Sequence, residues 1–352
     1  MSHSLGIIGY GGMAGYHHSC INNQLSDILN VTAAFDIDPE RLALAEKAGL
    51  KTFDNVEDFF ASSLFDIVLV ATPNNFHRHY VISAIEHGFH VVCEKPVAIT
   101  VEDFDCMTAA AKKHGKVFSV HQNRRWDRDY RIVKEAIDQG LIGKPYAIES
   151  RVHGQNGVVH GWREFKVAGG GMLFDWGVHQ IDQIVEMMGK EKVVSVYANL
   201  HSVRTPEVDD YYKLILRFSN GTTAQIETST YTLIQQPRWY AYGDGGSLVI
   251  DAWDCKGRII RAKDHMMNWE PVVVQTVAGP TRTMAPRPVE TLEEIPLPEA
   301  DPDWADYYRN VIAAIEGKEE LIVNEVNVRR VLQVMEAAFE SDRLNAGIAC
   351  EI

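Results

Sequence analysis

The sequence predicts an α/β protein with two parts, an N-terminal doubly wound parallel sheet and a C-terminal α+β domain with a large open, mostly antiparallel sheet. Three observations lead to this prediction. In the first third of the 352 residues, short apolar runs alternate with helical patterns, which is typical of βαβ units. A glycine-rich turn, Gly9–Ala14, follows the first apolar run. From Val193 onward, apolar and polar residues alternate, as in strands with one buried face.

The N-terminal domain is predicted over residues 1–123. Its strands are expected at runs that are apolar on both sides, because strands covered by helices on both faces have this composition. Asp38-Pro39 supplies a cap and a first-turn proline for one helix, and Thr100 caps another helix that Gly115 ends. The expected strands are Leu5–Gly9, Val31–Asp36, Ile67–Ala71, Val91–Cys93 and Val117–His121.

The second domain, for substrate binding and oligomerisation, is predicted over residues 124–352. Asn220-Gly221 predicts a hairpin turn, because both positions favour positive φ. Gly279–Pro302 is rich in proline and predicts a long irregular surface excursion. Two closing helices are expected near 303–341, where they could pack against the first domain. The other expected elements are a helix at Tyr130–Gln139, a strand at Tyr146–Val152 and a helix from Met172 to Met188.

Composition narrows the class of protein. A net charge of −14, from 34 Lys and Arg against 48 Asp and Glu, disfavours nucleic acid or an anionic membrane as the main partner. A hydrophobic content of 46% excludes a mainly disordered chain. The five cysteines are dispersed, as in proteins of a reducing compartment. No apolar run approaches the ~20 residues that span a bilayer, and no leader-like segment opens the chain. These features predict a cytoplasmic protein.

The turn Gly9–Ala14 matches the pattern G-x-G-x-x-A between a predicted strand and a predicted helix. The first glycine permits the tight turn, the second lets a diphosphate approach the backbone, and Ala14 allows helix and strand to pack closely. Asp36, at the end of the second strand, can accept hydrogen bonds from the adenosine ribose and would repel a 2′-phosphate. The motif therefore predicts NAD rather than NADP. A glycine-rich turn that only connects strand and helix is the alternative.

Two further clusters carry candidate chemistry. Lys95, in Glu94-Lys95-Pro96, follows a buried strand at the edge where open α/β sheets bind ligands, and its amine can stabilise charge on a substrate oxygen. Asp175, His179 and Asp182 are spaced i, i+4, i+7 and would share one helix face. Acidic neighbours would fix the tautomer of His179 and stabilise its protonated form, which suits a general base. The alternatives are a solvated lysine, a structural histidine and a metal site, and no metal is predicted.

Through these motifs, the chain resembles the Gfo/Idh/MocA family of glucose-fructose oxidoreductase and inositol dehydrogenase-like enzymes over essentially its whole length. The longest match is Gly169–Asp182, which reads GGGMLFDWGVHQID. The other matching segments are Gly9–Ala14, Ala71–His77, Glu94–Pro96 and Trp162-Arg163. The resemblance implies an N-terminal Rossmann domain and a homodimer or homotetramer assembled through the open second sheet.

The resemblance also implies hydride transfer between a nicotinamide and a hydroxyl of a sugar or polyol. In the implied mechanism, His179 accepts the hydroxyl proton, Lys95 donates to that oxygen and Asp175 orients the pair. These three are the expected catalytic residues. The expected cofactor-binding residues are Gly9, Gly11, Gly12, Met13, Asp36, Thr72, Pro73, Asn74, His77, Glu94, Lys95, Gln122, Trp162 and Arg163. The expected substrate-binding residues are Lys95, His153, Arg163, Asp175 and His179.

Substrate identity is expected to depend on the irregular segment His153–Lys166. The side chains that suit a polyhydroxylated ligand there are His153, Gln155, Asn156, His160, Trp162 and Arg163. Two other functions remain open from the sequence, a glycosidase that oxidises its sugar transiently with bound NAD and a non-catalytic NAD- or sugar-sensing protein. Arg124 and Arg125 are expected at the cofactor or the domain boundary. His17 and His18 are expected to be surface or packing residues.

Overall fold

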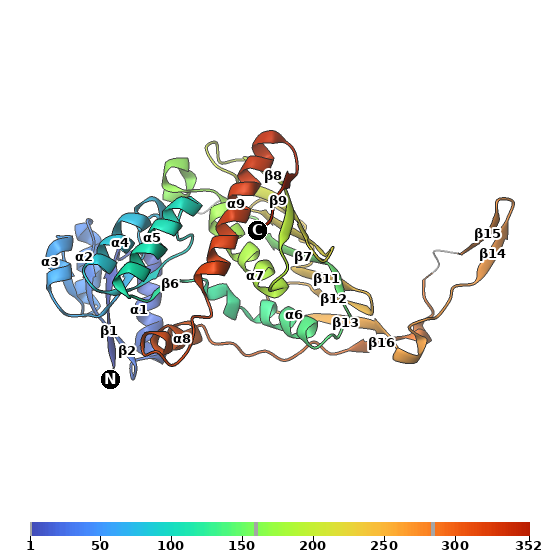
Figure 1. Ribbon diagram of the computed structural model, residues 1–352, viewed down its shortest axis with the longest axis horizontal. Coiled ribbons are helices and arrows are strands. Elements are labelled where there is room, and N and C mark those ends of the chain that lie inside the picture. Colours follow the sequence, from blue (N-terminus) through green and yellow to red (C-terminus); the bar gives the residue numbers. More distant parts are fainter. Residues whose placement is uncertain (1, 158–160, 283–285) are drawn as a thin grey trace.

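The computed structural model describes residues 2–157, 161–282 and 286–352. The described strands form two large sheets and one small two-stranded sheet (Figure 1). The first sheet and its helices form one end of the molecule, and the second sheet follows beyond it. The predicted combination of a parallel sheet with a large, mostly antiparallel sheet is confirmed.

The first sheet is parallel throughout and has the strand order β3-β2-β1-β4-β5-β6. The order reverses between β1 and β4, and in such sheets the ligand binds outside the carboxyl ends of the strands at this point. The strands are β1 (His3–Ile8), β2 (Leu29–Phe35), β3 (Lys51–Phe53), β4 (Ile67–Val70), β5 (His90–Cys93) and β6 (Phe118–Val120). The helices between them are α1 (Gly12–Gln24), α2 (Pro39–Lys47), α3 (Val56–Ala61), α4 (His77–Glu86) and α5 (Val101–His114).

The predicted helix ends are confirmed by their geometry. The Asp38 side chain accepts a hydrogen bond from the Glu40 amide, and α2 then begins at Pro39. Thr100 accepts from the Asp103 amide at the start of α5. Gly115 ends α5 in the left-handed conformation, with φ +64°. Each cap satisfies main-chain groups that the helix itself leaves unpaired.

The second sheet has nine strands in the order β16-β13-β12-β11-β7-β10-β9-β8-β17. Only the pair β7–β10 is parallel among its described pairs. The predicted turn at Asn220-Gly221 joins β9 to β10, with φ +88° at Gly221. The strands are β7 (Pro145–His153), β8 (Val193–His201), β9 (Tyr211–Phe218), β10 (Thr223–Ser229), β11 (Trp239–Gly243), β12 (Gly246–Ile250), β13 (Gly257–Ala262), β16 (Leu292–Ile295) and β17 (Ile348–Ala349).

Helices α6 (Arg128–Asp138), α7 (Val178–Met188) and α9 (Glu325–Leu344) contact this sheet through β11, β10 and β8. Helix α9 and α8 (Ala305–Ile315) also return to the first sheet (Figure 1). Arg329 of α9 forms an ion pair with Asp105 of α5 at 2.8 Å, and the Glu336 side chain accepts from the Val101 amide. The end of the chain therefore ties the two sheets together.

The expectation for Gly279–Pro302 was wrong in part. This segment contains β15 (Gly279–Arg282), which pairs with β14 (Val273–Thr276) in a ribbon that extends far from the body (Figure 1). It also contains β16, which pairs with β13 at the edge of the second sheet. Pro280 is tolerated in β15, because an edge strand leaves its outer amide groups without a strand partner, and β16 contains no proline.

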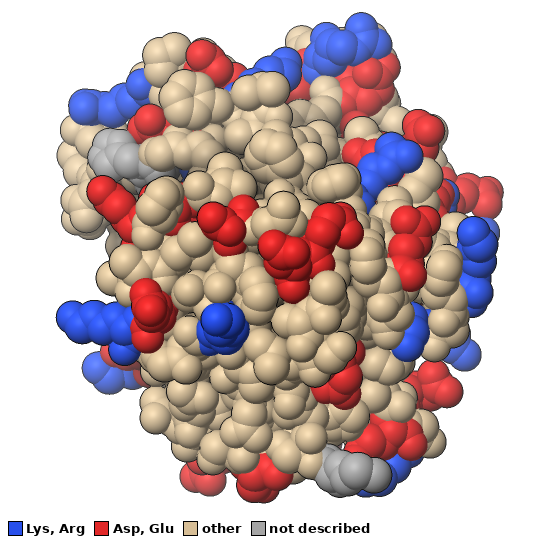
Figure 2. Space-filling model, turned by 90° about the vertical axis from the view of Figure 1, so that its left-hand side faces the viewer, with Lys and Arg blue, Asp and Glu red and all other residues tan. Residues whose placement is uncertain are grey.

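Figure 2 views the molecule from the end formed by the first sheet. Acidic side chains are scattered over this face, and Lys and Arg do not merge into one patch there. This distribution agrees with the net charge of −14. Within the described residues, no helix is long and apolar enough to cross a membrane.

Candidate active site

A cavity of about 660 Å³ lies at the carboxyl ends of β1, β2, β4 and β5. This is the crevice that the strand order predicts as a ligand site. Twelve of the fourteen residues expected to bind the cofactor line it. They are Gly9, Gly11, Gly12, Met13, Asp36, Thr72, Pro73, Asn74, Glu94, Lys95, Trp162 and Arg163.

The glycine turn is shaped for close approach of a ligand. Gly9 has φ +89°, and a Cβ there would lie 2.9 Å from the Ala71 carbonyl oxygen, so a side chain would be both strained and blocked. The positions above Gly11 and Gly12 are open, since a Cβ at either would meet nothing within 4 Å. Helix α1 begins at Gly12 and directs its free amide groups toward this space. The turn therefore fits a dinucleotide diphosphate.

The carboxylate of Asp36 lies in the same cavity. It accepts a hydrogen bond from the Tyr10 amide at 2.7 Å and one from the Asp38 amide at 2.9 Å. These contacts fix it at the end of β2, where the adenosine ribose would lie. Arg41 also lines the cavity near this end. A cation there could contact a 2′-phosphate, so both nicotinamide dinucleotides remain compatible with the wall.

Two expected cofactor residues lie off the cavity wall. His77 is fully buried, with Nδ1 3.0 Å from the Pro96 carbonyl oxygen and Nε2 2.9 Å from the Thr72 carbonyl oxygen. It supports the loops after β4 and β5 from beneath. Gln122 is also buried, and its Oε1 has no hydrogen-bond partner among the described residues. Neither side chain lies on the wall of this cavity, so a role of these two residues in cofactor binding stays a prediction.

Lys95 and Asp175 bring the two parts of the molecule together. Lys95 Nζ lies 3.0 Å from Oδ1 and 2.9 Å from the main-chain oxygen of Asp175. Arg163 Nε lies 3.3 Å from the same Oδ1. Burial alone would raise the pKa of Asp175, but the charges of Lys95 and Arg163 outweigh it and hold the pKa below its usual value. Asp175 is therefore an anion that two cations orient.

His179 lies on the first turn of α7, directly after a π-helical turn at Leu173–Gly177 that carries Asp175. It is 4% exposed, and Nδ1 has no hydrogen-bond partner among the described residues. Burial and the nearby charges of Lys95 and Arg124 hold the pKa of His179 well below its usual value. The imidazole is therefore neutral and able to accept a proton at neutral pH.

The expected effect of Asp182 on His179 was wrong. The Asp182 carboxylate receives two hydrogen bonds from Arg125, at 2.6 and 2.7 Å, and both side chains are buried. Arg125 also donates to the Ile322 carbonyl oxygen, so it seals the junction between the two parts of the chain. Burial, together with the cations Lys95 and Arg124, lowers the pKa of His179, so its protonated form is disfavoured. The sequence spacing placed the carboxylate on the helix correctly but could not identify its partner.

A second cavity, of about 360 Å³, lies beside these residues on the side of the second sheet. Trp176, which lines it, has its ring centroid 6.2 Å from that of His179. His153 lines it as expected, whereas Gln155 and Asn156 are exposed and lie off its wall. His160 falls outside the described residues. The lining residues are Arg124, Val152, His153, Gly154, Gly157, Met172, Trp176, Thr228, Ser229, Thr230 and Trp253.

Sequence reasoning missed a buried network beneath Lys95. His17 Nε2 and His121 Nδ1 lie 2.6 and 2.8 Å from the same oxygen of Glu94, and Tyr308 Oη lies 2.6 Å from His17 Nδ1. Burial alone would raise the pKa of Glu94, but His121 and His17 hold it well below its usual value. The other carboxylate oxygen accepts from the Lys95 amide at 3.1 Å.

Three residues of this network could hold a metal ion, because their ligand atoms lie within 4.8 Å of one another. They are His17, Glu94 and His121. The two imidazoles contact one carboxylate oxygen at hydrogen-bond distances, which a hydrogen-bond network explains without an ion.

One feature of the sequence could have indicated that His17 is buried in this network. His17 follows Ala14 by three residues, so it shares the helix face that packs on the sheet.

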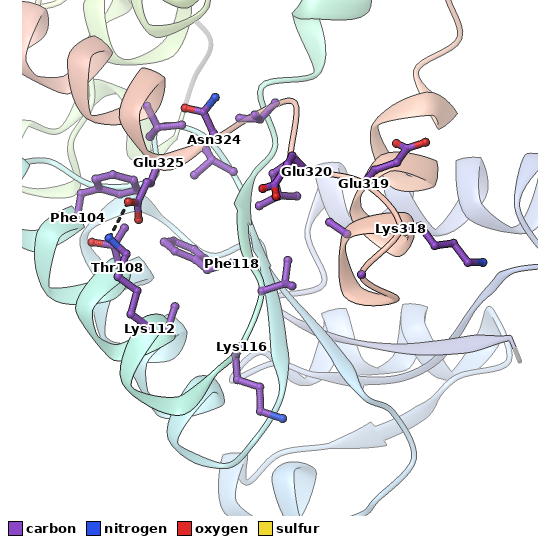
Figure 3. Close-up of a pocket in the computed structure, with 18 residues that line it drawn as sticks. Phe104, Thr108, Lys112, Lys116, Phe118, Lys318, Glu319, Glu320, Asn324 and Glu325 are labelled. Carbon is purple, nitrogen blue, oxygen red and sulfur yellow. Dashed lines mark hydrogen bonds and ion pairs between the residues drawn. The ribbon is translucent and has the colours of Figure 1, made fainter.

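A third cavity, of about 590 Å³, lies elsewhere, between α5, the edge strand β6 and the segment before α9 (Figure 3). Phe118 points into it from β6, and Lys112 forms an ion pair with Glu325 across one side at 2.6 Å. None of the described residues expected to bind cofactor or substrate lines it. The dinucleotide crevice and the adjoining cavity are therefore the candidate active site.

A glycine turn on an open space, an acid at the end of β2 and a lysine at the carboxyl end of β5 define a dinucleotide-binding protein of the Rossmann type. Comparison with protein families identifies it further. Residues 4–122 match the oxidoreductase family with an NAD-binding Rossmann fold, and residues 130–249 match the Gfo/Idh/MocA C-terminal domain. The chain belongs to the Gfo/Idh/MocA oxidoreductase family.

Individual relatives agree with this assignment. The crystal structure of an NAD-binding protein from Listeria innocua is 41% identical, covers 99% of both chains and superposes with a TM-score of 0.91. The scyllo-inositol 2-dehydrogenase (NADP(+)) IolW of Bacillus subtilis is 27% identical over 99% of this chain and 96% of its own. The 1,5-anhydro-D-fructose reductase of Ensifer adhaerens is 34% identical over 79% of this chain and 77% of its own.

Proposed function

We propose that this chain is an NAD-dependent dehydrogenase that oxidises a hydroxyl of a sugar, a polyol or a sugar derivative. The observation that carries the proposal is the contact of Lys95 Nζ with Asp175, next to a neutral, buried His179 and at the mouth of a dinucleotide-shaped cavity. A binding protein would need only the cavity. An amine, a carboxylate and an unprotonated imidazole are the groups that alcohol oxidation requires.

The proposed cofactor is NAD. The open turn over Gly11 and Gly12 fits the diphosphate, and Asp36 fits the ribose hydroxyls. An unsubstituted ribose gains hydrogen bonds from this carboxylate, whereas a 2′-phosphate meets its negative charge. Two observations favour NADP instead, the presence of Arg41 in the cavity wall and the name of the relative IolW. The preference therefore depends on whether Asp36 or Arg41 lies closer to the ribose.

When bound, the nicotinamide ring supplies the hydride acceptor for the carbon that bears the reacting hydroxyl. His179 takes the hydroxyl proton; its lowered pKa keeps the ring unprotonated, so that the ring nitrogen is free to accept a proton. Lys95 donates a hydrogen bond to the same oxygen and stabilises the charge that develops there. Asp175 holds the amine in this direction and, with Arg163, is available to a neighbouring hydroxyl. With NAD⁺ in this cavity as the hydride acceptor, the alcohol would become a carbonyl and its proton would rest on His179.

Substrate binding is assigned to Lys95, Asp175, His179, Arg163 and the cavity that His153 borders. Hydroxyl-rich ligands need several hydrogen-bonding groups around a small volume, and the cavity that His153 borders offers them on Thr228–Thr230, next to Trp176 and His179. The names of the relatives, an inositol dehydrogenase and an anhydrofructose reductase, concern polyhydroxylated rings. Both arguments support a sugar or polyol.

The test is a panel of sugars and polyols incubated with NAD⁺ or NADP⁺, with reduced nicotinamide followed by absorbance. We expect stoichiometric formation of reduced cofactor with at least one sugar or polyol, faster with NAD⁺. Cleavage of a glycoside without net reduced cofactor would identify the redox-assisted glycosidase instead. Cofactor and sugar binding without either product would identify a sensor.

We also propose that the open face of the second sheet joins two or four copies of the chain. Tyr197 and Ile215 are paired across β8 and β9, and both are exposed on the face opposite to the helices, whereas their neighbours Val196 and Leu216 are buried. A sheet with one uncovered apolar face is stabilised when that face packs against a second copy of the chain and is removed from water. Replacement of Ile215 by Lys should convert the oligomer to monomer in light-scattering measurements, and a wild-type monomer would contradict the proposal.

A further inference from the structure

Two tryptophans form one wall of the cavity beside His179. The ring of Trp176 lies 6.2 Å from that of His179, and the ring of Trp253, in the turn between β12 and β13, lies 5.8 Å from that of Trp176. Trp253 is 49% exposed, whereas most large aromatic side chains bury their apolar surface. An exposed indole at the edge of a cavity offers a flat apolar surface to a ligand.

Trp253 is held in a fixed orientation by buried polar groups. The guanidinium carbon of Arg238 lies 4.5 Å from the Trp253 ring centroid. Arg238 is 4% exposed, donates to Ser150 Oγ at 2.9 Å and lies 3.0 Å from an Asp129 carboxylate oxygen. A side chain that is already oriented loses little conformational entropy when a ligand binds. The platform that Trp253 and Trp176 form is therefore ordered before the substrate binds.

Arg124 contributes to the same wall. Its guanidinium carbon lies 4.1 Å from the Trp176 centroid and 5.8 Å from the Trp253 centroid. It also forms an ion pair with Asp127 at 2.7 Å. Arg124 therefore supports both indoles, while its charge is compensated by a neighbouring carboxylate.

The cations near the two tryptophans and Asp175 are also paired with carboxylates. A phosphate or carboxylate on the substrate would need a cation that is free to pair with it. Burial lowers the pKa of His153, so this ring adds no charge at neutral pH. Arg124 pairs with Asp127, Arg238 pairs with Asp129, and Lys95 and Arg163 share Asp175. Each of these four cations therefore already has a carboxylate partner.

On the proposed dehydrogenase function we infer that the substrate is a neutral glycoside, with the oxidised ring against Trp176 and the aglycone on Trp253. Trp176 is adjacent to the base, so it contacts the ring that reacts. Trp253 contacts Trp176 and is more exposed, so it meets a substituent of that ring. The remaining wall offers uncharged main-chain and hydroxyl groups of Gly154, Gly157 and Thr228–Thr230, which suit sugar hydroxyls. Trp253 is thereby a specificity-determining residue.

The test compares phenyl and methyl glycosides in both anomeric forms with the corresponding free hexoses, hexose 6-phosphates and uronates, at saturating NAD⁺. We expect kcat/KM to be at least tenfold higher for a phenyl glycoside than for the free hexose, and lowest for the charged sugars. Trp253→Ala should raise KM for the phenyl glycoside at least tenfold more than KM for the free hexose, with kcat changed less than threefold. Trp253→Phe should recover most of the loss, because it restores a flat ring.

A matched control is Trp269→Ala. Trp269 also stacks on an arginine, Arg287 at 5.6 Å, but lies in the loop before β14 and lines neither cavity. We expect its kinetic constants to match those of the wild type. Equal effects of Trp253→Ala on all sugars, or a preference for a charged sugar, would overturn the inference.

Absence of turnover with every sugar would contradict the proposed dehydrogenase and not the platform. Calorimetric titration of the NAD⁺-loaded protein with the phenyl glycoside then decides the inference by itself. Binding that Trp253→Ala weakens at least tenfold and Trp269→Ala leaves intact supports the platform. Binding that neither variant changes, or no binding to the wild type, overturns it.

Discussion

Lys95 Nζ lies within 3.0 Å of two oxygen atoms of Asp175, its Oδ1 and its main-chain oxygen, although the two residues are 80 positions apart and belong to different sheets. Lys95 follows β5 of the first sheet, and Asp175 belongs to the π-helical turn that leads into α7. Lys95 lines the dinucleotide cavity, and His179 follows Asp175 by one helical turn.

Removal of the Lys95 amine should impair chemistry more than cofactor binding. Lys95→Ala should lower kcat about 10²-fold, because one donor to a developing oxyanion is lost. The Kd for NAD⁺, measured by fluorescence titration, should change less than threefold, since the glycine turn and Asp36 are intact. Lys112→Ala, at an exposed ion pair beside the third cavity, is the control and should be neutral. Loss of binding with chemistry preserved would contradict the role.

The pH profile should report the lowered pKa of His179. The neutral imidazole is the active form, so kcat/KM should fall only at pH values below 6.5, the ordinary pKa of histidine. Arg124→Gln removes a positive charge that lowers this pKa, so the acidic limb should move upward toward 6.5. A limb that stays in place in this variant would indicate that another group is titrating.

Cofactor preference should depend on Asp36. Asp36→Ser removes the negative charge that opposes a 2′-phosphate, so the ratio of kcat/KM for NAD⁺ to that for NADP⁺ should fall at least tenfold, equivalent to about 1.4 kcal/mol. The change should appear mainly in KM, because the ribose lies away from the reacting atoms. Asp54→Ser, at an exposed acid after β3 that does not line the cavity, is the matched control. A wild-type preference for NADP⁺ would show that Arg41 dominates this end of the cavity.

His121 should make folding stability depend on pH. Burial, with His17, lowers its pKa to about 4, whereas in the unfolded chain it would be about 6.5. The unfolded state therefore binds the proton first, so stability is present at neutral pH and is lost as the pH falls. Between pH 7 and pH 5 this loss should be about 2 kcal/mol.

His121→Asn keeps a donor for Glu94 but does not titrate. Urea denaturation at both pH values should therefore show a loss that is about 2 kcal/mol smaller than in the wild type. The same loss in both proteins would contradict the prediction and assign the pH dependence to other buried histidines.

Local rules were sufficient for much of the fold. Asp38, Thr100, Gly115 and Asn220-Gly221 act through neighbouring main-chain groups, so their effects can be read from a few residues. The dinucleotide turn is equally local, which explains why Gly9–Ala14 could be interpreted from sequence. The β14–β15 ribbon was missed because its proline content suggested irregular chain, and proline is compatible with an edge strand.

Contacts between distant residues could not be predicted from sequence. Asp182 accepts hydrogen bonds from Arg125, 57 positions away in the chain. Glu94 contacts His17 and His121, which come from two other segments of the chain. The charge state of His179 was expected to follow its helix neighbours, but it follows Lys95 and burial. A pKa depends on everything packed around a group, so helix periodicity alone gave the wrong sign.

We propose that Lys95 and His179 act on the same oxygen in one step. The decisive measurement is a double-mutant cycle of kcat with Lys95→Ala, His179→Ala and the double variant, since groups that act as a unit show non-additive effects. Each single variant should lose about 10²-fold or more, and the double variant should be no more than threefold slower than the worse single one. A double variant whose loss equals the product of the two single losses would mean that the amine and the imidazole act independently.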